Sequence, residues 1–338
     1  MPLRIAVLLA FLCAGFASAR SKDLDAYFID VEGGQATLIV TPAGQSVLID
    51  AGWGDNNFRD ANRIAAAAKR AKVKKIDYFI LTHYHADHVG GVPQLAEKLK
   101  VGTFIDHGPN RETGSKRQQR MVDDYSKTIS GAQHIVPKPG DKLPIKGVDV
   151  TVVSADGNII QNSLPGGGEQ NPWCAKTPDK QTDTSENARS LGTFWQMSNF
   201  RMVDLGDLTW NKEKELVCPA NRLGKVSVFI VSHHGLDWSN SPALVDAIAP
   251  EVAIMGNGAK KGGSPATYDT LKAAPGIQAI WQLHFAEAGG KEHNTADAFI
   301  ANVDEADTGF FLKLTAHPDG SFEVYNPRNK MTKSYAGH

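Results

Sequence analysis

The chain is poor in cysteine and has no excess charge of either sign. Three cysteines occur among 338 residues, which leaves too few thiols for a Cys-rich metal site. The 36 basic and 37 acidic residues give a formal net charge of -1. The sequence therefore lacks the global basic field that draws a protein onto nucleic acid or an anionic membrane surface.

The sequence also lacks an interdomain linker and any low-complexity tract. Its hydrophobic content of 41% and charged content of 22% are ordinary for a soluble globular protein. The chain is long enough to bury a full core. We therefore expect a single domain over residues 20–338.

The first nineteen residues have the pattern of a signal peptide. Arg4 gives a positive start, residues 5–16 are apolar, and a small-residue Ala-Ser-Ala site ends at residue 19. The apolar run is too short to span a bilayer, and an uncleaved anchor is the alternative. We expect a mature chain that begins near Arg20, has no membrane attachment and is periplasmic or secreted.

Export would affect the two cysteines that remain, Cys174 and Cys218. An oxidising compartment favours a disulfide between them. Two separate thiols are the alternative, because the sequence does not give the distance between their Cα atoms. Both alternatives stay open at this point.

Short apolar segments alternate with helical segments along much of the chain. In the first part, strands are predicted at residues 26–31, 36–40, 46–50, 76–82 and 101–106, and helices at 57–72 and 92–100. In the last part, strands are predicted at residues 226–232, 251–256 and 277–285, and helices at 241–249 and 266–274. Between them lies a loop at residues 156–187, long enough to be functional or disordered. The alternation predicts an α/β layered fold.

One loop, "LTHYHADHVGG" at residues 81–91, carries His83, His85, Asp87 and His88. It follows a predicted strand and precedes a helix, so these side chains belong to the carboxyl end of a strand, where α/β sheets hold ligands. His83 and His85 can converge on one ion, while Asp87 and His88 turn toward a second. Imidazole and carboxylate ligands suit zinc, and also manganese or iron.

Further candidate ligands follow later strands. Asp207 in "MVDLGDL" can bridge two ions with its two oxygens, and "FIVSHHGL" ends a strand with His233 and His234. Taken alone, Asp207 also fits the N-cap of a following helix. Together with the first cluster, a second metal site is the better interpretation.

These strings resemble the metallo-β-lactamase superfamily over most of the mature chain. "THYHADH" is similar to its H-x-H-x-D-H signature, Asp50 in "LIDAG" to its strand-end aspartate, and Asp207 to its bridging aspartate, with His233 or His234 as the late histidine. Within the superfamily, "FIDVEGGQATLI", "ENARSLG", "GDL" and "SHHG" resemble the hydrolase domain of bacterial competence proteins that internalise DNA. The resemblance implies a four-layered αβ/βα sandwich with a binuclear site on its edge.

The chain departs from this pattern in two places. Competence-type domains tend to have glycine-histidine-proline where this chain reads "GGSP", with Ser264 before the proline. The third histidine for the first metal also has no clear counterpart. The candidates are His107, His134 and His284, and we favour His107 and His284 over His134.

The ions imply a mechanism. Two metal ions can hold a bridging hydroxide as the nucleophile, because they lower the pKa of bound water toward about 7. We assign catalytic roles to Asp87, which would orient the nucleophile, and to His233, which would protonate the leaving group. The predicted metal ligands are His83, His85, Asp87, His88, Asp207 and His234, with His284 and His107 as further candidates.

Three functions are compatible with these residues. The first is an exported binuclear hydrolase that acts on phosphodiesters, using two divalent ions, zinc foremost. The second uses the same site on a β-lactam or a lactone, and the third is a secreted metal-binding protein without catalysis. Because the chain has no basic field, we expect a small or short phosphodiester rather than duplex DNA as the substrate.

Overall fold

The computed structural model describes residues 22–54, 56–112, 114–304 and 309–337. The expected signal peptide at residues 1–19 lies outside the described residues. Within the described part of the chain, no helix has both the length and the apolar character needed to cross a membrane.

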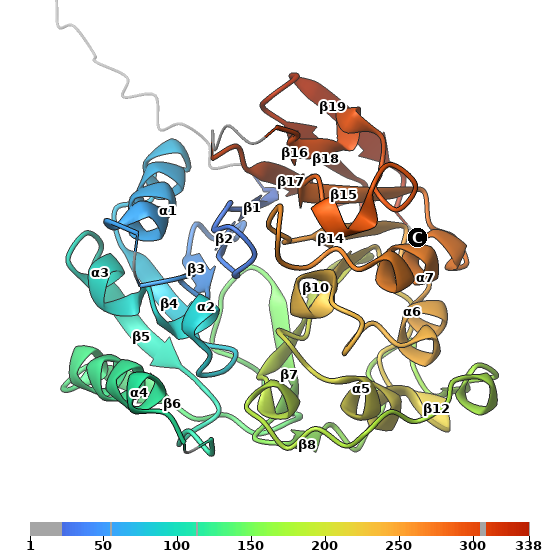
Figure 1. Cartoon of the computed structure of the whole chain (residues 1–338), viewed down its shortest axis with the longest axis horizontal. Coiled ribbons are helices and arrows are strands. Elements are labelled where there is room, and N and C mark those ends of the chain that lie inside the picture. Colours follow the sequence, from blue (N-terminus) through green and yellow to red (C-terminus); the bar gives the residue numbers. More distant parts are fainter. Residues whose placement is uncertain (1–21, 55, 113, 305–308, 338) are drawn as a thin grey trace, which may run out of the picture.

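One large sheet combines strands from both ends of the described chain (Figure 1). β1, β2 and β3 pair antiparallel, and β3 to β6 pair parallel. Over the residues described, its nine strands in sheet order are β19 (Met331–Tyr335), β18 (Phe322–Asn326), β17 (Leu312–Ala316), β1 (Leu24–Phe28), β2 (Thr37–Val40), β3 (Ser46–Ile49), β4 (Ile76–Ile80), β5 (Val101–Ile105) and β6 (Gln133–Ile135). β3 is buried along its whole length, as expected of a strand covered on both faces.

The second sheet is built from the later part of the chain. β8, β7, β10 and β11 pair antiparallel, whereas β11, β13, β14, β15 and β16 pair parallel. Its eight strands, counted in the described ranges, are β16 (Ile300–Asn302), β15 (Ala279–His284), β14 (Val252–Met255), β13 (Val228–Ile230), β11 (Phe200–Asp204), β10 (Gly192–Met197), β7 (Asp149–Ala155) and β8 (Asn158–Ile159).

Helices cover the outer face of each sheet (Figure 1). On the first sheet these are α1 (Arg59–Arg70), α2 (Ala86–Val89), α3 (Val92–Ala96) and α4 (Lys116–Ile129). On the second they are α5 (Trp210–Val217), α6 (Pro242–Ile248) and α7 (Pro265–Ala273). Between the two sheets, buried side chains such as Ile49, Trp195 and Trp281 form one continuous core. The expected four-layered αβ/βα sandwich is confirmed.

Local sequence signals start two of these helices. The Ser115 hydroxyl accepts a hydrogen bond from Gln118 N at 2.9 Å before α4, and the Ser241 hydroxyl accepts one from Leu244 N at 3.3 Å before α6. Pro242 follows the second cap, at the first helical position, where its missing N–H costs nothing.

The long loop at residues 156–187 is tied to the second helical layer. A disulfide joins Cys174 in this loop to Cys218, the residue that ends α5. A two-stranded ribbon of β9 (Glu169–Gln170) and β12 (Ala220–Asn221) adds backbone hydrogen bonds nearby. Of the two alternatives for the cysteines, the structure therefore has the paired one, and the loop has fixed anchor points.

The topology gathers the ends of parallel strands from both sheets on one edge of the sandwich. β3 and β4 end there in the first sheet, and β11, β13, β14 and β15 end there in the second. Loops at the carboxyl ends of such strands are the usual place for ligand sites. The predicted site residues lie in these loops.

Candidate metal centre

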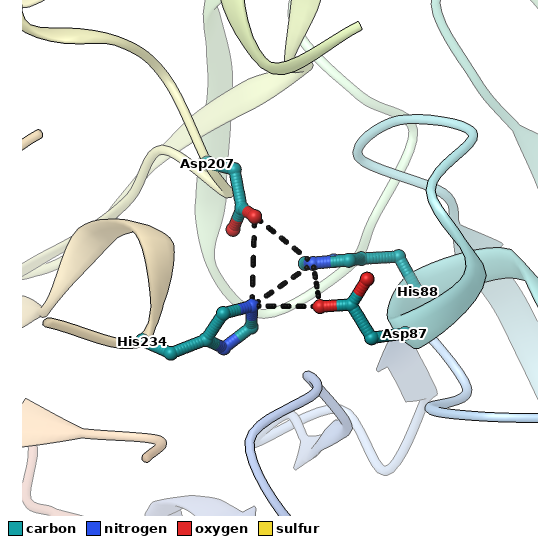
Figure 2. Close-up of side chains that lie close together, drawn as sticks. All are labelled: Asp87, His88, Asp207 and His234. Atoms are coloured by element: carbon teal, nitrogen blue, oxygen red, sulfur yellow. Dashed lines mark hydrogen bonds and ion pairs between the residues drawn. The ribbon is translucent and has the colours of Figure 1, made fainter. Parts of the chain in front are cut away.

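Four side chains from three distant parts of the chain meet at this edge (Figure 2). Asp87, His88, Asp207 and His234 are all buried, and one ligand atom of each lies within 4.8 Å of the others. The His234 Nε2 atom is 3.0 Å from Asp87 Oδ2, and His88 Nε2 is 3.3 Å from Asp207 Oδ2. Such a group of imidazole and carboxylate atoms could hold a divalent metal ion.

The first pair, Asp87 and His88, lies on the short helix α2, which follows β4 after a loop at residues 81–85. Gln35 N donates a hydrogen bond to the Asp87 carbonyl at 3.1 Å. A Cβ atom at Gly34 would lie 2.5 Å from that same carbonyl oxygen, so only glycine allows this approach. The "EGGQ" turn therefore packs against α2 and helps to fix the position of Asp87 in the site.

His233 and His234 take an unusual backbone conformation. Their φ angles are 53° and 55°, in the left-handed region that non-glycine residues seldom adopt. The turn is held by hydrogen bonds from His233 N to Gly206 O at 3.0 Å and from Gly263 N to His234 O at 2.9 Å. Strain of this kind concentrates at functional sites.

The two rings share Asp207 as a partner, at 3.5 Å from its Oδ2 atom, but differ in their other partners. His234 Nε2 is 3.0 Å from Asp87 Oδ2, within the group of four. His233 Nε2 is 3.5 Å from Asp207 Oδ2 and 3.4 Å from Asn187 Nδ2. His234 is therefore the histidine placed with Asp87 and His88, whereas His233 contacts Asp207 and Asn187.

Asp50 orients the ring of His88. His88 Nδ1 donates to Asp50 Oδ2 at 2.6 Å, which turns Nε2 toward the group of four. Thr82 fixes the carboxylate in turn, with its N donating to Asp50 Oδ1 at 2.8 Å and its hydroxyl to Oδ2 at 2.7 Å. A carboxylate behind an imidazole is typical of metal-binding histidines.

Neighbouring histidines hold both carboxylates of the group of four in their charged form. Burial opposes ionisation of Asp207, but His88, His234 and the other histidines hold the pKa of its carboxyl well below the usual range. Burial also opposes ionisation of Asp87, and His88 and His234 likewise hold its pKa well below the usual range. Burial, reinforced by His88, keeps the pKa of His83 well below its usual value, so this imidazole is uncharged.

His83 lies beside the group of four, whereas His85 is turned outward. The His83 Nε2 atom is 3.7 Å from Asp207 Oδ2, and its ring centroid is 4.1 Å from that of His88. His85 Nε2 is instead 2.9 Å from Glu112 Oε2, although the His83 and His85 rings remain 4.7 Å apart. His83 is thus one of the histidines whose Nε2 atoms lie within 3.7 Å of Asp207 Oδ2.

The remaining candidate histidines pair with carboxylates elsewhere. His107 Nε2 is 2.9 Å from Glu186 Oε2, and His284 Nε2 is 2.8 Å from Asp30 Oδ1 in a separate group with Glu32. The group around Asp207 includes neither His107 nor His284. The N-cap interpretation of Asp207 is also not what the structure has, because α5 begins after Thr209.

Buried polar atoms without a partner test whether these residues fit a metal ion. His83 Nε2 and Asp207 Oδ1 are both buried and lack any hydrogen-bond partner. An unsatisfied buried polar atom costs about 1–3 kcal/mol, and a bound cation would remove that cost at both atoms. The donor set therefore fits a divalent ion.

Sequence reasoning did not assign Asn187 to the site. Its Nδ2 atom is 3.4 Å from His233 Nε2, and its Oδ1 atom is buried without a hydrogen-bond partner. It belongs to the string "ENARSLG", which was the one available signal. Asn187 and His233 also line a cavity of about 700 Å³, together with Arg111, Glu112, residues 181–185, Leu236 and Trp238.

A buried glutamate supports the loop that follows His234. In α5, Glu213 accepts hydrogen bonds from Asn240 N at 2.8 Å and Ser241 N at 2.7 Å. Asn240 Nδ2 in turn donates to Ser232 O at 2.9 Å, directly before the two histidines. Burial nonetheless raises the pKa of the Glu213 carboxyl to about 7, from 4.5 for an ordinary glutamate.

This pKa predicts how stability depends on pH. Below about pH 4.5 the carboxyl is protonated in both folded and unfolded chains, and as the pH rises toward 7 only the folded chain keeps the proton. Relative to Glu213→Gln, the wild type should therefore lose about 3 kcal/mol of unfolding free energy between pH 4.5 and 8. Urea denaturation of both proteins across this range measures the difference. The exposed neighbour provides the control Glu215→Gln, and a pH-independent difference for Glu213→Gln would contradict the prediction.

Part of the chain is similar to known proteins. Residues 29–155 match the model of the metallo-beta-lactamase superfamily. The chain is 22% identical over 251 residues to ComE operon protein 3 of Bacillus subtilis, covering 70% of this chain and 29% of that protein. It is 30% identical over 117 residues to hydroxyacylglutathione hydrolase of Klebsiella pneumoniae, covering 35% of this chain and 36% of that protein.

Among solved structures, a diphosphatase from the PhnP family is similar to 77% of this chain, with 12% identity, a TM-score of 0.41 and 94% of its own length covered. The chain spans about a third of the length of the curated relatives that it matches. The family match includes Asp50 and the H-x-H-x-D-H loop, and Asp207 and His234 complete the group of four from outside it. Residues 29–155 of the chain therefore match a metallo-beta-lactamase superfamily domain.

Proposed function

We propose that this protein is an exported, binuclear metal-dependent hydrolase that acts on small or short phosphodiesters. The proposal rests on the buried group of Asp87, His88, Asp207 and His234. Two potential metal-ligand atoms there, His83 Nε2 and Asp207 Oδ1, are buried without a hydrogen-bond partner. The members of the group of four come from three separate segments of the chain at one edge of the sandwich, an arrangement that the fold alone does not require.

Two sets of residues would hold the ions. Asp87, His88 and His234 would bind one ion, and His83 and His85 the other, with Asp207 between them. Zinc is the first candidate for such imidazole and carboxylate ligands, with manganese and iron as alternatives. When bound, the ions would act as Lewis acids and lower the pKa of water. Binding His85 would require its ring to leave Glu112, which it contacts at 2.9 Å.

His233 is the residue proposed to move protons. Burial lowers the pKa of this imidazole despite the nearby carboxylate of Asp207, so the ring is neutral at neutral pH. Its Nδ1 atom is 3.3 Å from Ser239 Oγ, and it lines the cavity beside the metal centre. A neutral imidazole can accept the proton of an attacking water and pass it to the leaving oxygen.

The cavity supports a small substrate. Its volume of about 700 Å³ is within the range of small-molecule sites. Trp238 on its wall is 56% exposed and offers a flat apolar surface to the organic part of a substrate. The likeness to competence-type domains supports the phosphodiester class, and paired metal ions suit the in-line displacement that such an ester requires.

Export is supported by the disulfide between Cys174 and Cys218. Such bonds persist in oxidising compartments and are rare in the cytosol. Together with the leader-like sequence at residues 1–19, the disulfide favours a periplasmic or secreted enzyme.

The test is a substrate panel on the purified, metal-loaded protein. It compares bis(p-nitrophenyl) phosphate, a short single-stranded oligonucleotide, nitrocefin, a lactone and a hydroxyacylglutathione, with zinc and manganese as alternative ions. We expect the phosphodiester to be hydrolysed at least about tenfold faster than nitrocefin, because paired ions can clamp both the attacking and the leaving oxygen.

The same panel discriminates the alternatives. Rapid opening of nitrocefin with both phosphodiesters left intact would contradict the proposal and favour the β-lactam function. Preferred cleavage of hydroxyacylglutathione would favour a thioester substrate, as the name of the Klebsiella relative suggests. Metal binding with no turnover on any member would favour a metal-binding protein without catalysis.

A further inference from the structure

A lysine ammonium touches the edge of the candidate metal centre. Lys261 lies in the loop after β14, and its Nζ atom forms an ion pair with Asp87 Oδ2. The lysine side chain is 32% exposed, whereas Asp87 is only 9% exposed. The ammonium therefore lies between the buried carboxylate and the solvent.

The loop backbone fixes where Lys261 begins. Gly258 N donates to Lys261 O at 2.8 Å, and Glu287 N donates to Ala259 O at 2.9 Å. A Cβ atom at Gly33 would lie 2.8 Å from the Lys261 Cβ, so the "EGGQ" turn packs directly against the base of this side chain. The side chain is thus aimed at the centre by a closely packed loop.

Trp53 provides a second contact for the ammonium. The Lys261 Nζ atom is 5.0 Å from the centroid of the Trp53 ring, within the range of a cation–π interaction. Such a contact stabilises the cation without neutralising it. The contact with the Trp53 ring therefore leaves the ammonium able to form an ion pair with an anion.

Arg111, which lines the cavity, and two further cationic side chains have partners outside the group of four. Arg111 Nη2 is 2.8 Å from Asp156 Oδ2, and Arg189 Nη1 is 3.0 Å from Asp156 Oδ1. Lys180 contacts the carbonyl of Asp237 and lies 4.1 Å from the Trp210 ring centroid. Lys261 is different because its ion-pair partner is itself a member of the group of four.

Metal binding would change the balance at Asp87. A carboxylate oxygen that binds a divalent cation attracts an ammonium less, and the cation also repels the ammonium directly. The exposed part of Lys261 gives the ammonium room to turn toward solvent, with the Trp53 ring still beside it. A substrate anion placed on the metal centre would come within its reach.

We propose that Lys261, backed by Trp53, forms an anion subsite that contacts a non-bridging oxygen of the substrate phosphate and selects phosphodiesters over neutral esters. The inference rests on the proposed function for the identity of the substrate. The subsite itself requires only a phosphate group at the metal centre. Lysine is a common phosphate partner because its ammonium is a compact point charge with three donors.

The test compares Lys261→Met with Lys260→Met, whose wild-type residue is the exposed neighbour in the same loop. Inorganic phosphate is titrated into each metal-loaded protein by calorimetry, with metal content measured on the same samples. We expect phosphate to bind at least about tenfold more weakly to Lys261→Met, because a charge-assisted contact is lost. Lys260→Met should stay within about twofold of the wild type.

Turnover gives a second readout. For Lys261→Met, kcat/KM on bis(p-nitrophenyl) phosphate should fall about 10- to 100-fold. On p-nitrophenyl acetate it should change less than about threefold, because this ester is uncharged and would make no ion pair with Lys261. Lys261→Arg should recover most of the loss, since it keeps the charge.

Two outcomes would overturn the proposal. One is phosphate affinity in Lys261→Met equal to that of the wild type, and the other is weak phosphate binding that follows from loss of metal in the variant. If the wild type cleaves no phosphodiester but Lys261→Met still loses phosphate affinity with its metal retained, the proposed function fails and the anion subsite stands.

Discussion

Asp207→Asn should lower turnover by about 10²- to 10³-fold or more while the fold is retained. Asp207 Oδ2 lies 3.3 Å from His88 Nε2, 3.5 Å from His234 Nε2 and 3.7 Å from His83 Nε2. Removing one charge-stabilising group from an active site typically costs about 2.7–4 kcal/mol of transition-state stabilisation, and each 1.4 kcal/mol or so is a factor of ten in a rate or binding constant. The measurement is kcat together with the metal content of each protein.

A matched control separates this effect from a general loss of stability. Asp246→Asn changes an aspartate of α6 that lies at a different cavity, and it should leave turnover near the wild-type value. The melting temperature of Asp207→Asn should stay within a few degrees of the wild type, because the amide has the same shape. Wild-type turnover in Asp207→Asn would mean that another residue bridges the ions.

Removing the metal should abolish hydrolysis, and re-adding it should restore hydrolysis with about two ions bound per chain. The proposed ligands, His83, His85, Asp87, His88, Asp207 and His234, exceed the four that one tetrahedral site can use. Elemental analysis at saturating metal counts the ions, and dialysis against a chelator tests the dependence. A thermal melt should also shift downward after chelation, because an ion that binds only the folded chain stabilises it.

Two results would contradict this prediction in different ways. One ion or fewer at saturation would count against a binuclear centre but leave metal dependence intact. Full turnover after exhaustive chelation would remove the metal from the reaction altogether. The phosphate titrations above use the same metal-loaded samples, so metal content is known for both experiments.

The layered fold was predictable because its signals are local. Apolar strands and amphipathic helices alternate along the chain, and such a pattern has few ways to bury its apolar faces. Errors fall where local signals are weak: α3 ends at Ala96, although a helix to residue 100 was predicted. The edge strand β19, whose residues are mostly polar, was not predicted at all. Its pairing with β18 depends on a neighbour rather than on its own composition.

The candidate site was predictable where its residues are adjacent in sequence. His83, Asp87 and His88 share one loop, so their spacing alone indicates a common ligand. The choice between His233 and His234 was not predictable, because it depends on two successive left-handed φ angles that turn neighbouring rings toward different partners. Neither residue type nor spacing encodes that geometry.

Contacts between site residues that are far apart in the sequence were not predictable for the same reason. His284 ends a strand, as expected of a metal ligand. Its Nε2 atom instead pairs with Asp30 Oδ1 of the "FIDV" segment, at 2.8 Å. Lys261 belongs to a loop with two successive lysines, and only the packing of that loop against Gly33 separates it from its exposed neighbour. Contacts between residues so far apart in the chain depend on the assembled sandwich.

The disulfide joins Cys174 and Cys218, which are 44 positions apart in the sequence, and so closes a covalent ring of the chain between them. Asn187 and Asp207 both lie inside that ring. A peptide bond cut between residues 174 and 218, for example at the exposed Lys180, would therefore open the ring without releasing either fragment. The half of the site that belongs to the second sheet would stay tethered after a single cut, and only reduction of the disulfide would let the two pieces separate as chains.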